Sequence, residues 1–482
     1  MFGTITTEML LAVLPEIALL VLVAIVFIVD LILVEKQRGG LAWLTAAGLA
    51  ITFFLTLFFA RPGDSSELVW GGMLRHDWLA YIFKLLFLAT AFLTALLTVG
   101  WECIWRKGEF YVLLLTSTLG MTLMAASADL IMLFLSIETT SIPLYIMAGF
   151  MTEDDKSTES GFKYLLFGAM TTAVMLYGLS LLYGFAGTTN LYEMATALNA
   201  AKVPGPVLVG TLLLILLGFG FKVALVPLHF WAPDVYEGAP TPVTAFLSTA
   251  SKAAGFAVLA RVMIAAFPSI LADWQTIIAI AAGLSMTVGN AVALTQHNIK
   301  RLLAYSSIAH AGYALLGVAA ASELGVVSVV YYFLVYAVTQ MAAFAIVIIV
   351  WHKVGSDEIE DYAGLSRRSP MLAVAMLLAF LSLAGVPPLG GFIAKILVFA
   401  AAVEAGLVWL AVLGVLNAIV GLYYYLIVLK VIYLSEPKDE RPVPVLRSHA
   451  AALITTIALV LVLGIVLAPW FSWAQASAAG LF

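Results

Sequence analysis

Four charged side chains stand in stretches of the sequence that are otherwise apolar enough to cross a membrane. They are one glutamate and three lysines: Glu138, Lys222, Lys252 and Lys395. A lysine at the centre of a membrane helix costs roughly 2.5–3.5 kcal/mol on insertion scales, so such residues usually have a function. Burial lowers the pKa of a lysine and a nearby carboxylate raises it, so amines and a carboxyl group can exchange protons. These residues therefore indicate a proton path, with Glu138 as the natural partner of Lys222. The alternative is a set of buried ion pairs that only holds helices together.

The stretch from Lys222 to Lys252 contains helix breakers and further titratable groups. Four prolines lie between the two lysines, together with His229. Proline removes a backbone donor and clashes with the preceding turn, so we expect the helix to break at Pro227. His229 stands two residues after Pro227 and could brace that break. Ser248 precedes Lys252 by one helical turn and therefore shares its face.

Other charged positions are more ambiguous. His310, in YSSIAHAGY, falls in the middle of an apolar stretch. It could relay protons, since an unperturbed histidine titrates near neutrality, or it could be a core residue hydrogen-bonded to Ser306. Lys84 and Lys430 lie nearer the ends of their apolar stretches, where we expect the side chain to extend to the membrane surface.

The composition places the chain among helical membrane proteins. Of its 482 residues, 63% are hydrophobic and 11% are charged, against about 25% charged residues in soluble domains. Apolar runs recur from end to end without the alternation of a β-barrel. The single cysteine, Cys103, excludes an intrachain disulfide, a cysteine-based zinc site and a protein-bound iron–sulfur cluster. No Walker A loop or dinucleotide-binding glycine pattern occurs in the right context, and no basic tail indicates nucleic acid. We expect no cofactor and no metal on this chain.

The apolar runs predict an all-α polytopic membrane protein with about fourteen transmembrane helices. Two of them are long and interrupted, the seventh at Pro227 and Pro233, and the twelfth at Gly385–Gly391, which includes Pro387 and Pro388. The predicted spans are residues 10–34, 40–60, 77–100, 109–125, 129–150, 161–184, 206–237, 242–265, 274–294, 300–319, 324–352, 370–402, 405–433 and 449–473. In a bilayer, broken helices survive only where they are buried in protein or line a wet cavity.

The two broken spans are five apart in the chain, which indicates a repeated unit. A unit with an odd number of spans reverses direction when it is repeated, so two inverted five-helix repeats are predicted. The expected divisions are residues 1–108 (three helices), 109–266 (first repeat), 267–435 (second repeat) and 436–482 (last helix). Gly218 precedes Lys222 by four residues, as Gly391 precedes Lys395, and we expect these glycines to clear space beside the lysines, unless the match is chance.

Lysine and arginine residues predict the orientation of the chain. With the N-terminus outside, fourteen of them lie in or near inner loops and four on the outer side. The inner cations are Lys36, Arg38, Arg106, Lys107, Lys156, Lys163, Lys300, Arg301, Lys353, Arg367, Arg368, Lys438, Arg441 and Arg447, and the outer ones are Arg61, Arg75, Lys202 and Arg261. By the positive-inside rule, both termini face outside.

Two segments carry a resemblance to a known family. KVALVPLHFWAPDVYEGAPTPVTAFLSTASK, from Lys222 to Lys252, closely resembles the signature of the proton-translocating, antiporter-like subunits of respiratory complex I. NIKRLLAYSSIAHAGY, Asn298–Tyr313, is similar to the matching signature in the second half. Lys395 in PPLGGFIAKILVF differs from the M type, which has a glutamate there. The L type has a long C-terminal extension, whereas this chain ends at Phe482, so it looks most like the N type.

The resemblance implies a role for each site residue. It places Glu138 and Lys222 on the side where protons enter, Lys252 as the connecting residue, His310 as a possible relay and Lys395 as the last residue before exit. It implies an enzyme subunit without redox chemistry of its own, since NADH, FMN, iron–sulfur clusters and quinone belong to other subunits.

The resemblance also implies partners and a location. The expected partners are the small membrane subunits and the M-type antiporter-like subunit, in a bacterial inner membrane, with both termini periplasmic. Two other readings stay open: a subunit of a multisubunit sodium/proton antiporter, which a sodium requirement would favour, and a purely structural membrane subunit, in which neutral replacement of Lys222 would leave proton movement intact.

Overall fold

A computed structural model describes the chain except for residues 1–5, 35–36, 64–65, 102, 438 and 482. Two of the cations used to predict the orientation, Lys36 and Lys438, lie outside the described residues, as does the last residue, Phe482.

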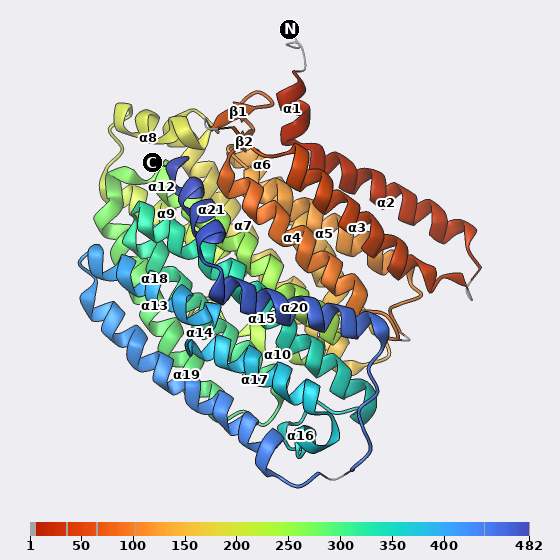
Figure 1. The fold of residues 1–482 in the computed structure, drawn as a ribbon. Coiled ribbons are helices and arrows are strands. Elements are labelled where there is room, and N and C mark those ends of the chain that lie inside the picture. Colours follow the sequence, from red (N-terminus) through yellow and green to blue (C-terminus); the bar gives the residue numbers. More distant parts are fainter. Residues whose placement is uncertain (1–5, 35–36, 64–65, 102, 438, 482) are drawn as a thin grey trace.

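The structure is a bundle of helices with one small β-hairpin (Figure 1). The elements are α1 (Thr7–Ala12), α2 (Leu14–Ile32), α3 (Gly40–Phe59), β1 (Glu67–Val69), β2 (Leu74–His76), α4 (Trp78–Leu97), α5 (Gly108–Ala126), α6 (Leu130–Ala148), α7 (Asp155–Ala186), α8 (Leu191–Ala200), α9 (Gly205–Lys222), α10 (Trp231–Gly238), α11 (Thr241–Phe246), the π-helix η2 (Leu247–Ser251), α12 (Lys252–Ala266), the 3₁₀-helix η3 (Pro268–Ile270), α13 (Leu271–Ala293), α14 (Ile299–Ala320), α15 (Glu323–Val354), the 3₁₀-helix η4 (Ile359–Tyr362), α16 (Leu365–Arg368), α17 (Pro370–Ala384), α18 (Gly390–Glu404), α19 (Val408–Leu434), α20 (Arg447–Ile465) and α21 (Ala468–Ala479).

Membrane-spanning length confirms the predicted fold class. Within the described residues, 13 helices are long and apolar enough to cross a membrane, and α17 is a shorter apolar helix. If α17 and α18 together are counted as one interrupted crossing, the described residues provide fourteen crossings, as the apolar runs predict. Elements α1 and α21 lie at one end of the bundle with the hairpin and α8, and α16 lies at the other end (Figure 1).

The order of elements is the same in the two halves of the bundle. Three continuous helices, α5 to α7, precede the broken pair α9–α10 and a further crossing, and α13 to α15 precede the broken pair α17–α18 and α19. Packing repeats too, since α5 packs on α6 as α13 packs on α14, and α7 packs on α9 as α15 packs on α17 and α18. An odd number of crossings gives the halves opposite directions. The residue bounds given to the repeats stay a prediction.

Several local predictions were wrong in detail. Pro233 lies in the first turn of α10, where its missing N–H has no helical partner to lose, so it does not break the chain. The last predicted span ends early, because Pro469 in the first turn of α21 separates that helix from α20. The hairpin and α8 were not predicted, since both are short. Helix α8 shows only three buried apolar residues, Leu191, Met194 and Leu198.

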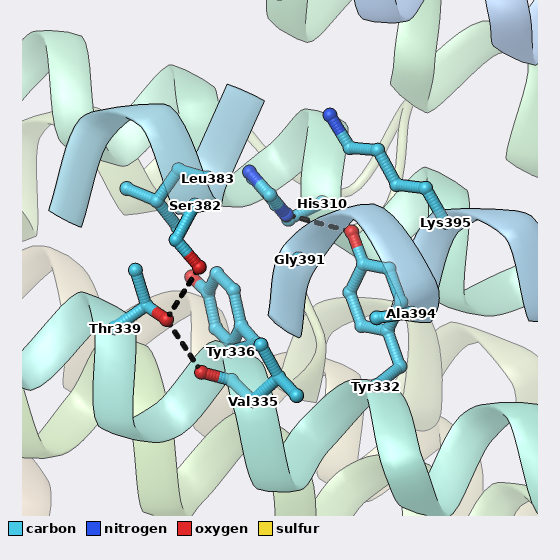
Figure 2. Close-up of a pocket in the computed structure, with 10 residues that line it drawn as sticks. All are labelled: His310, Tyr332, Val335, Tyr336, Thr339, Ser382, Leu383, Gly391, Ala394 and Lys395. Carbon is cyan, nitrogen blue, oxygen red and sulfur yellow. Dashed lines mark hydrogen bonds between the residues drawn. The ribbon is translucent and has the colours of Figure 1, made fainter. Parts of the chain in front are cut away.

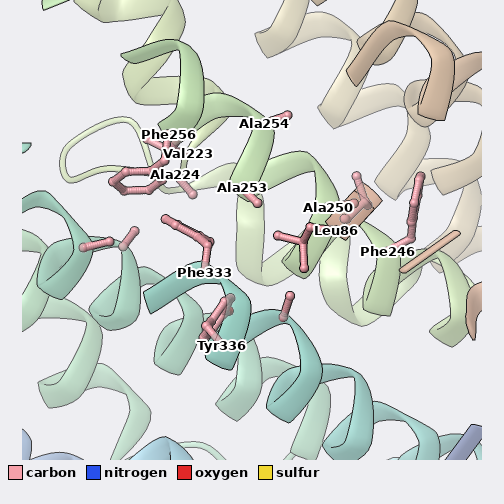
Figure 3. Close-up of a cluster of buried hydrophobic side chains, with 14 of the residues drawn as sticks. Leu86, Val223, Ala224, Phe246, Ala250, Ala253, Ala254, Phe256, Phe333 and Tyr336 are labelled. Atoms are coloured by element: carbon pink, nitrogen blue, oxygen red, sulfur yellow. The ribbon is translucent and has the colours of Figure 1, made fainter. Parts of the chain in front are cut away.

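The centre of the bundle is apolar around the break that follows α9. Val223, Ala224, Ala250 and Ala253 pack there together with the ring of Phe256 (Figure 3). The crossing from α11 to α12 is wholly buried in the bundle, whereas α2 and α7 expose most of their surface. A titratable side chain in this centre is therefore shielded from both lipid and bulk water.

The paired glycines permit close helix contact, which differs from the space-clearing role we predicted. A Cβ at Gly391 would come 1.7 Å from the backbone oxygen of Ser382, so α18 presses directly on α17. A Cβ at Gly218 would meet the Met175 side chain of α7, with its sulfur at 2.5 Å. A flexible methionine side chain can move away from an added Cβ, whereas a backbone carbonyl cannot. The requirement for glycine is therefore stricter at Gly391 than at Gly218.

Replacing Gly391 with alanine should destabilise the protein, because the added methyl group forces α17 and α18 apart. Overpacking costs about 1–3 kcal/mol, and a clash with backbone belongs at the upper end. The midpoint of thermal unfolding of purified protein measures the effect. Gly184→Ala is the control, because a Cβ there meets nothing within 4 Å. Equal midpoints for the two variants would contradict this packing.

Candidate functional site

The break that follows α9 leaves Lys222 as the last residue of a half-helix. The chain turns sharply there, with Ala224 at a φ of 57°. The freed carbonyl of Phe221 accepts from the backbone N–H of Ala224 at 3.0 Å and from Trp231 Nε1 at 3.1 Å. The Trp231 ring stacks on Tyr164 of α7, with ring centroids 4.5 Å apart. The break is thus braced by Trp231, and the C-terminal end of α9 favours a cation at Lys222.

Lys222 donates a hydrogen bond to a hydroxyl group near Glu138. Lys222 Nζ donates to Ser141 Oγ at 2.9 Å, and Ser141 lies one turn after Glu138 on α6. Among the described residues, no direct ion pair joins Glu138 to Lys222. Lys222 is only 6% exposed, whereas Glu138 is half-buried, and its Oε1 has no hydrogen-bond partner there. The pairing of Glu138 with Lys222 therefore stays a prediction.

Lys252 lies on a helix, α12, that packs closely against Lys222. It is the first residue after η2, and π-helical turns of this kind are frequent at functional sites. Lys252 Nζ donates to the Ser307 carbonyl at 2.8 Å and to Ser307 Oγ. Gly255, on the next turn, permits the approach, because a Cβ there would come 3.3 Å from Lys222 Cγ.

Ser307 connects Lys252 with tyrosines and, through them, with His310. Tyr336 donates to Ser307 Oγ at 2.9 Å, and its ring centroid lies 5.0 Å from that of His310. His310 Nδ1 is 2.6 Å from the Tyr332 hydroxyl, and Nε2 is 3.4 Å from the Tyr425 hydroxyl. Ser306 bonds to Tyr425 rather than to His310, which differs from the predicted core contact.

The second break also lies beside a buried lysine, Lys395, which belongs to the half-helix after the break. Lys395 Nζ donates to the carbonyl of Ala384, the last residue of α17, at 2.7 Å, and lies 4.8 Å from the centroid of the Tyr313 ring. Gly385 follows with a φ of 85°, a conformation that suits glycine. Lys395 and His310 line one small cavity, and Figure 2 shows them side by side.

The expected supporting residues lie near the breaks but differ in their contacts. Pro227 is in the turn after α9, and Pro387 and Pro388 are in the turn after α17. His229 is half-buried, and its Nδ1 has no hydrogen-bond partner among the described residues. Ser248 donates to the Ala245 carbonyl of its own helix at 3.0 Å.

Two buried ion pairs were not predicted from the sequence. Lys84 is 4% exposed and pairs with Glu16 of α2 at 2.8 Å, so the prediction that it reaches the membrane surface was wrong. The sequence feature that could have indicated this pair is Glu16, a carboxylate within the first apolar run. Arg261 Nη1 of α12 pairs with Asp77 at 2.7 Å, and Arg261 is fully buried. Lys430 is exposed, as predicted.

A metal site finds no support in the side-chain arrangement. Over the described ranges, no group of three or more His, Cys, Asp or Glu side chains could hold a metal ion. The site therefore consists of amines, hydroxyls, imidazole and one carboxyl group, which are suited to passing protons.

Comparisons with known proteins show the family of the chain. A profile of the family described as NADH:quinone oxidoreductase/Mrp antiporter, TM, matches residues 127–421. The chain is 44% identical to NADH-quinone oxidoreductase subunit N of Moorella thermoacetica over 94% of each protein. It is 41% identical to the protein of the same name from Heliobacterium modesticaldum over 100% of each.

Solved structures share the fold. A chain of respiratory complex I from Thermus thermophilus with bound aureothin is 34% identical, with a TM-score of 0.81, over 95% of this chain and 98% of that one. A chain of the Mrp complex from Dietzia sp. DQ12-45-1b is 20% identical, with a TM-score of 0.83, over 99% of this chain and 98% of that one, which shows the fold alone.

Replacing Lys84 with methionine should destabilise the protein, because it leaves the buried carboxylate of Glu16 without a cation. Breaking one partner of a buried pair costs about 3–5 kcal/mol, whereas replacing both partners is often neutral. The midpoint of thermal unfolding should therefore fall in Lys84→Met and recover in Glu16→Leu/Lys84→Met. The exposed Lys430→Met variant is the control. A double variant as unstable as the single one would contradict the pairing.

Proposed function

The chain belongs to the family of NADH-quinone oxidoreductase subunit N, and from this membership we propose that it carries protons across the membrane through Glu138, Lys222, Lys252, His310 and Lys395. NADH oxidation and quinone reduction in other subunits would drive the transfer. The chain would thus act as a proton-translocating part of an enzyme complex.

One observation supports the proposal: the five groups lie along a line of polar side chains and close helix contacts through an apolar bundle. Lys222 donates to Ser141, which lies one turn after Glu138, and Gly255 lets the helix of Lys252 approach Lys222. From Lys252 the line continues through Ser307 and Tyr336 to the cavity that His310 shares with Lys395. A purely structural set of charges would pair locally and would not need this continuity.

The chemistry follows from charge repulsion in a medium of low dielectric. A protonated Lys222 is stabilised by an ionised Glu138 and by the end of α9. When Glu138 takes up a proton, that stabilisation is lost and the Lys222 ammonium releases its proton to the next amine. Two neighbouring ammonium groups repel each other, so a proton on Lys252 favours onward transfer toward His310 and Lys395. Each step moves one proton and changes no bond other than N–H or O–H.

We infer that no redox cofactor binds to this chain. NADH, FMN, iron–sulfur clusters and quinone would bind to other subunits of the complex. The single cysteine, Cys103, supports this division, because an iron–sulfur cluster normally takes four cysteine ligands.

The exposure of Glu138 supports a neighbouring subunit on the α6 face. Leu135 and Ile142 flank it on that face and are 54% and 50% exposed. A half-buried carboxyl group beside exposed apolar side chains is costly in lipid, so a small membrane subunit with polar side chains would cover this face. The M-type antiporter-like subunit would be a further neighbour of the chain.

The loop charges support a bacterial inner membrane with both termini in the periplasm. Elements α1 and α21 lie at the same end of the bundle (Figure 1). The cation-rich loops, which include Arg106, Lys107 and Arg441, join helices at the other end and would face the cytoplasm.

Replacing Lys222 with alanine in the chromosomal copy should stop coupled turnover. Removal of a positioned proton carrier should lower NADH-driven quinone reduction and vesicle acidification roughly tenfold or more. A native gel confirms assembly of the complex. Lys202→Ala, at an exposed lysine, is the control. Activities of Lys222→Ala that stay at the wild-type level would refute the role of Lys222.

The α6 face should lie against a partner in the assembled complex. A cysteine at Ile142, in a Cys103→Ser background, should cross-link to another subunit under oxidation or with a short bifunctional reagent. The control is a cysteine at Ile51 of α3, which is 61% exposed on a wholly apolar face that suits lipid. Equal cross-linking at the two positions, or none at Ile142, would contradict the proposed interface.

A further inference from the structure

A network of ion pairs surrounds α10 on the inner face of the bundle. Arg301 of α14 bonds to Asp234 at 3.0 Å and to Glu237 at 2.8 Å, both on α10. Two lysines of α7 complete the network, Lys156 with Glu237 at 2.8 Å and Lys163 with Asp234 at 2.5 Å. These five residues, together with Lys300, are called the α10 clamp: Lys156, Lys163, Asp234, Glu237, Lys300 and Arg301. None of them belongs to the line of proton carriers.

Lys300 secures the end of α10 from inside the bundle. It is 4% exposed, and its Nζ donates to the carbonyls of Glu237 and Ala239 at 2.6 and 2.8 Å. These carbonyls lie where α10 ends and lack helical partners, so the ammonium group satisfies them. Asp357, 3.9 Å away, balances the charge, and burial raises the pKa of that carboxyl group. Burying the Lys300 ammonium group costs free energy, which is consistent with a role in holding α10 in place.

The α10 clamp is connected to Lys252 by two side chains. Tyr236 lies on α10 between the two clamp carboxylates in sequence, and its hydroxyl is 3.5 Å from Ser307 Oγ. Ser307 lies two turns after Lys300 on α14 and accepts the hydrogen bonds of Lys252. The clamp therefore fixes α10 and α14 relative to each other at the point where Tyr236 meets the acceptor of Lys252.

A cavity on the inner face ends at the same segment. It is lined by Lys156, Glu237, Thr241, Lys300 and Asp357, and its wall includes the turn from Gly238 to Pro240. A Cβ at Gly238 would come 2.2 Å from the Lys156 carbonyl, so this turn is pressed against the start of α7. The turn thus separates the inner cavity from the buried residues of α11 behind it, among them Thr244 and Ala245.

We propose that the α10 clamp is a gate, which holds α10 closed between the inner cavity and the Tyr236–Ser307–Lys252 contact and controls access of water and protons to Lys252. The inference rests on the proposed function of Lys252 and adds positioning residues to it. Partly exposed ion pairs are individually weak, which suits a segment that must open and close during turnover. Arg301 is the central member, because it contacts both carboxylates of α10.

Thiol labelling of a buried position behind the turn tests the gate. In a Cys103→Ser background, Ala245→Cys is exposed to a small, cationic methanethiosulfonate added to inside-out vesicles that contain the whole complex. Ala245 is 0% exposed, so labelling should be slow with the clamp intact. Arg301→Glu should raise the rate about tenfold or more, because opening of a local segment controls the reactivity of groups behind it. The charge-swapped Arg301→Glu/Glu237→Arg variant should lower the rate again.

Controls separate the gate from general loosening of the protein. Arg367→Glu removes an exposed cation of the same inner face and should leave the rate unchanged. If Arg301→Glu fails to assemble, Glu237→Gln weakens the clamp and keeps the Arg301–Asp234 pair. An unchanged labelling rate in an assembled clamp variant would overturn the proposal.

The ratio of protons moved to electrons transferred, measured in the same vesicles, tests the function on which the gate rests. Faster labelling with a lowered ratio supports both ideas. Faster labelling with an unchanged ratio supports the gate and contradicts the role of Lys252 as a proton carrier.

Discussion

The structure depends on the cost of placing a charged amine in a medium of low dielectric. Three lysines in the core of the bundle can carry protons only if each cationic form has acceptors close by. Lys222 has the end of α9 and Ser141, Lys252 has the oxygens of Ser307, and Lys395 has the last carbonyl of α17. Two of these three acceptor sets exist because a helix is interrupted. The breaks are thus what makes the charges tolerable in the membrane.

The sequence predicts the charged positions and the breaks well, because each is costly in an apolar run and therefore conspicuous. Glu138, Lys222 and the break at Pro227 all follow from one-dimensional patterns. What joins them does not, since Ser141 and Trp231 are ordinary residues whose role depends on a partner on another helix. The roles assigned to the five carriers and to Ser248 and His229 stay predictions.

Lys84 shows where the local pattern misleads. Its place near the end of an apolar run is typical of a side chain that reaches the membrane surface, yet it is buried against Glu16, 68 positions earlier in the chain. Only the packing of α2 on its neighbours decides between the two outcomes. Pro233 is a second example, because the same residue that breaks a helix in its interior begins one without cost. Long-range packing and position within a helix are the two quantities that sequence patterns report least well.

The central claim, that Glu138 and Lys222 exchange protons during turnover, can be observed at the carboxyl group itself. Infrared difference spectra of the intact complex, NADH-reduced minus oxidised, report the C=O stretch of a protonated carboxyl group. The account predicts a change in this band that disappears in Glu138→Gln and is altered in Lys222→Met, with the complex assembled in each case. A spectrum in which no carboxyl band depends on Glu138 would contradict the account, since the first carrier would then keep its protonation state throughout the cycle.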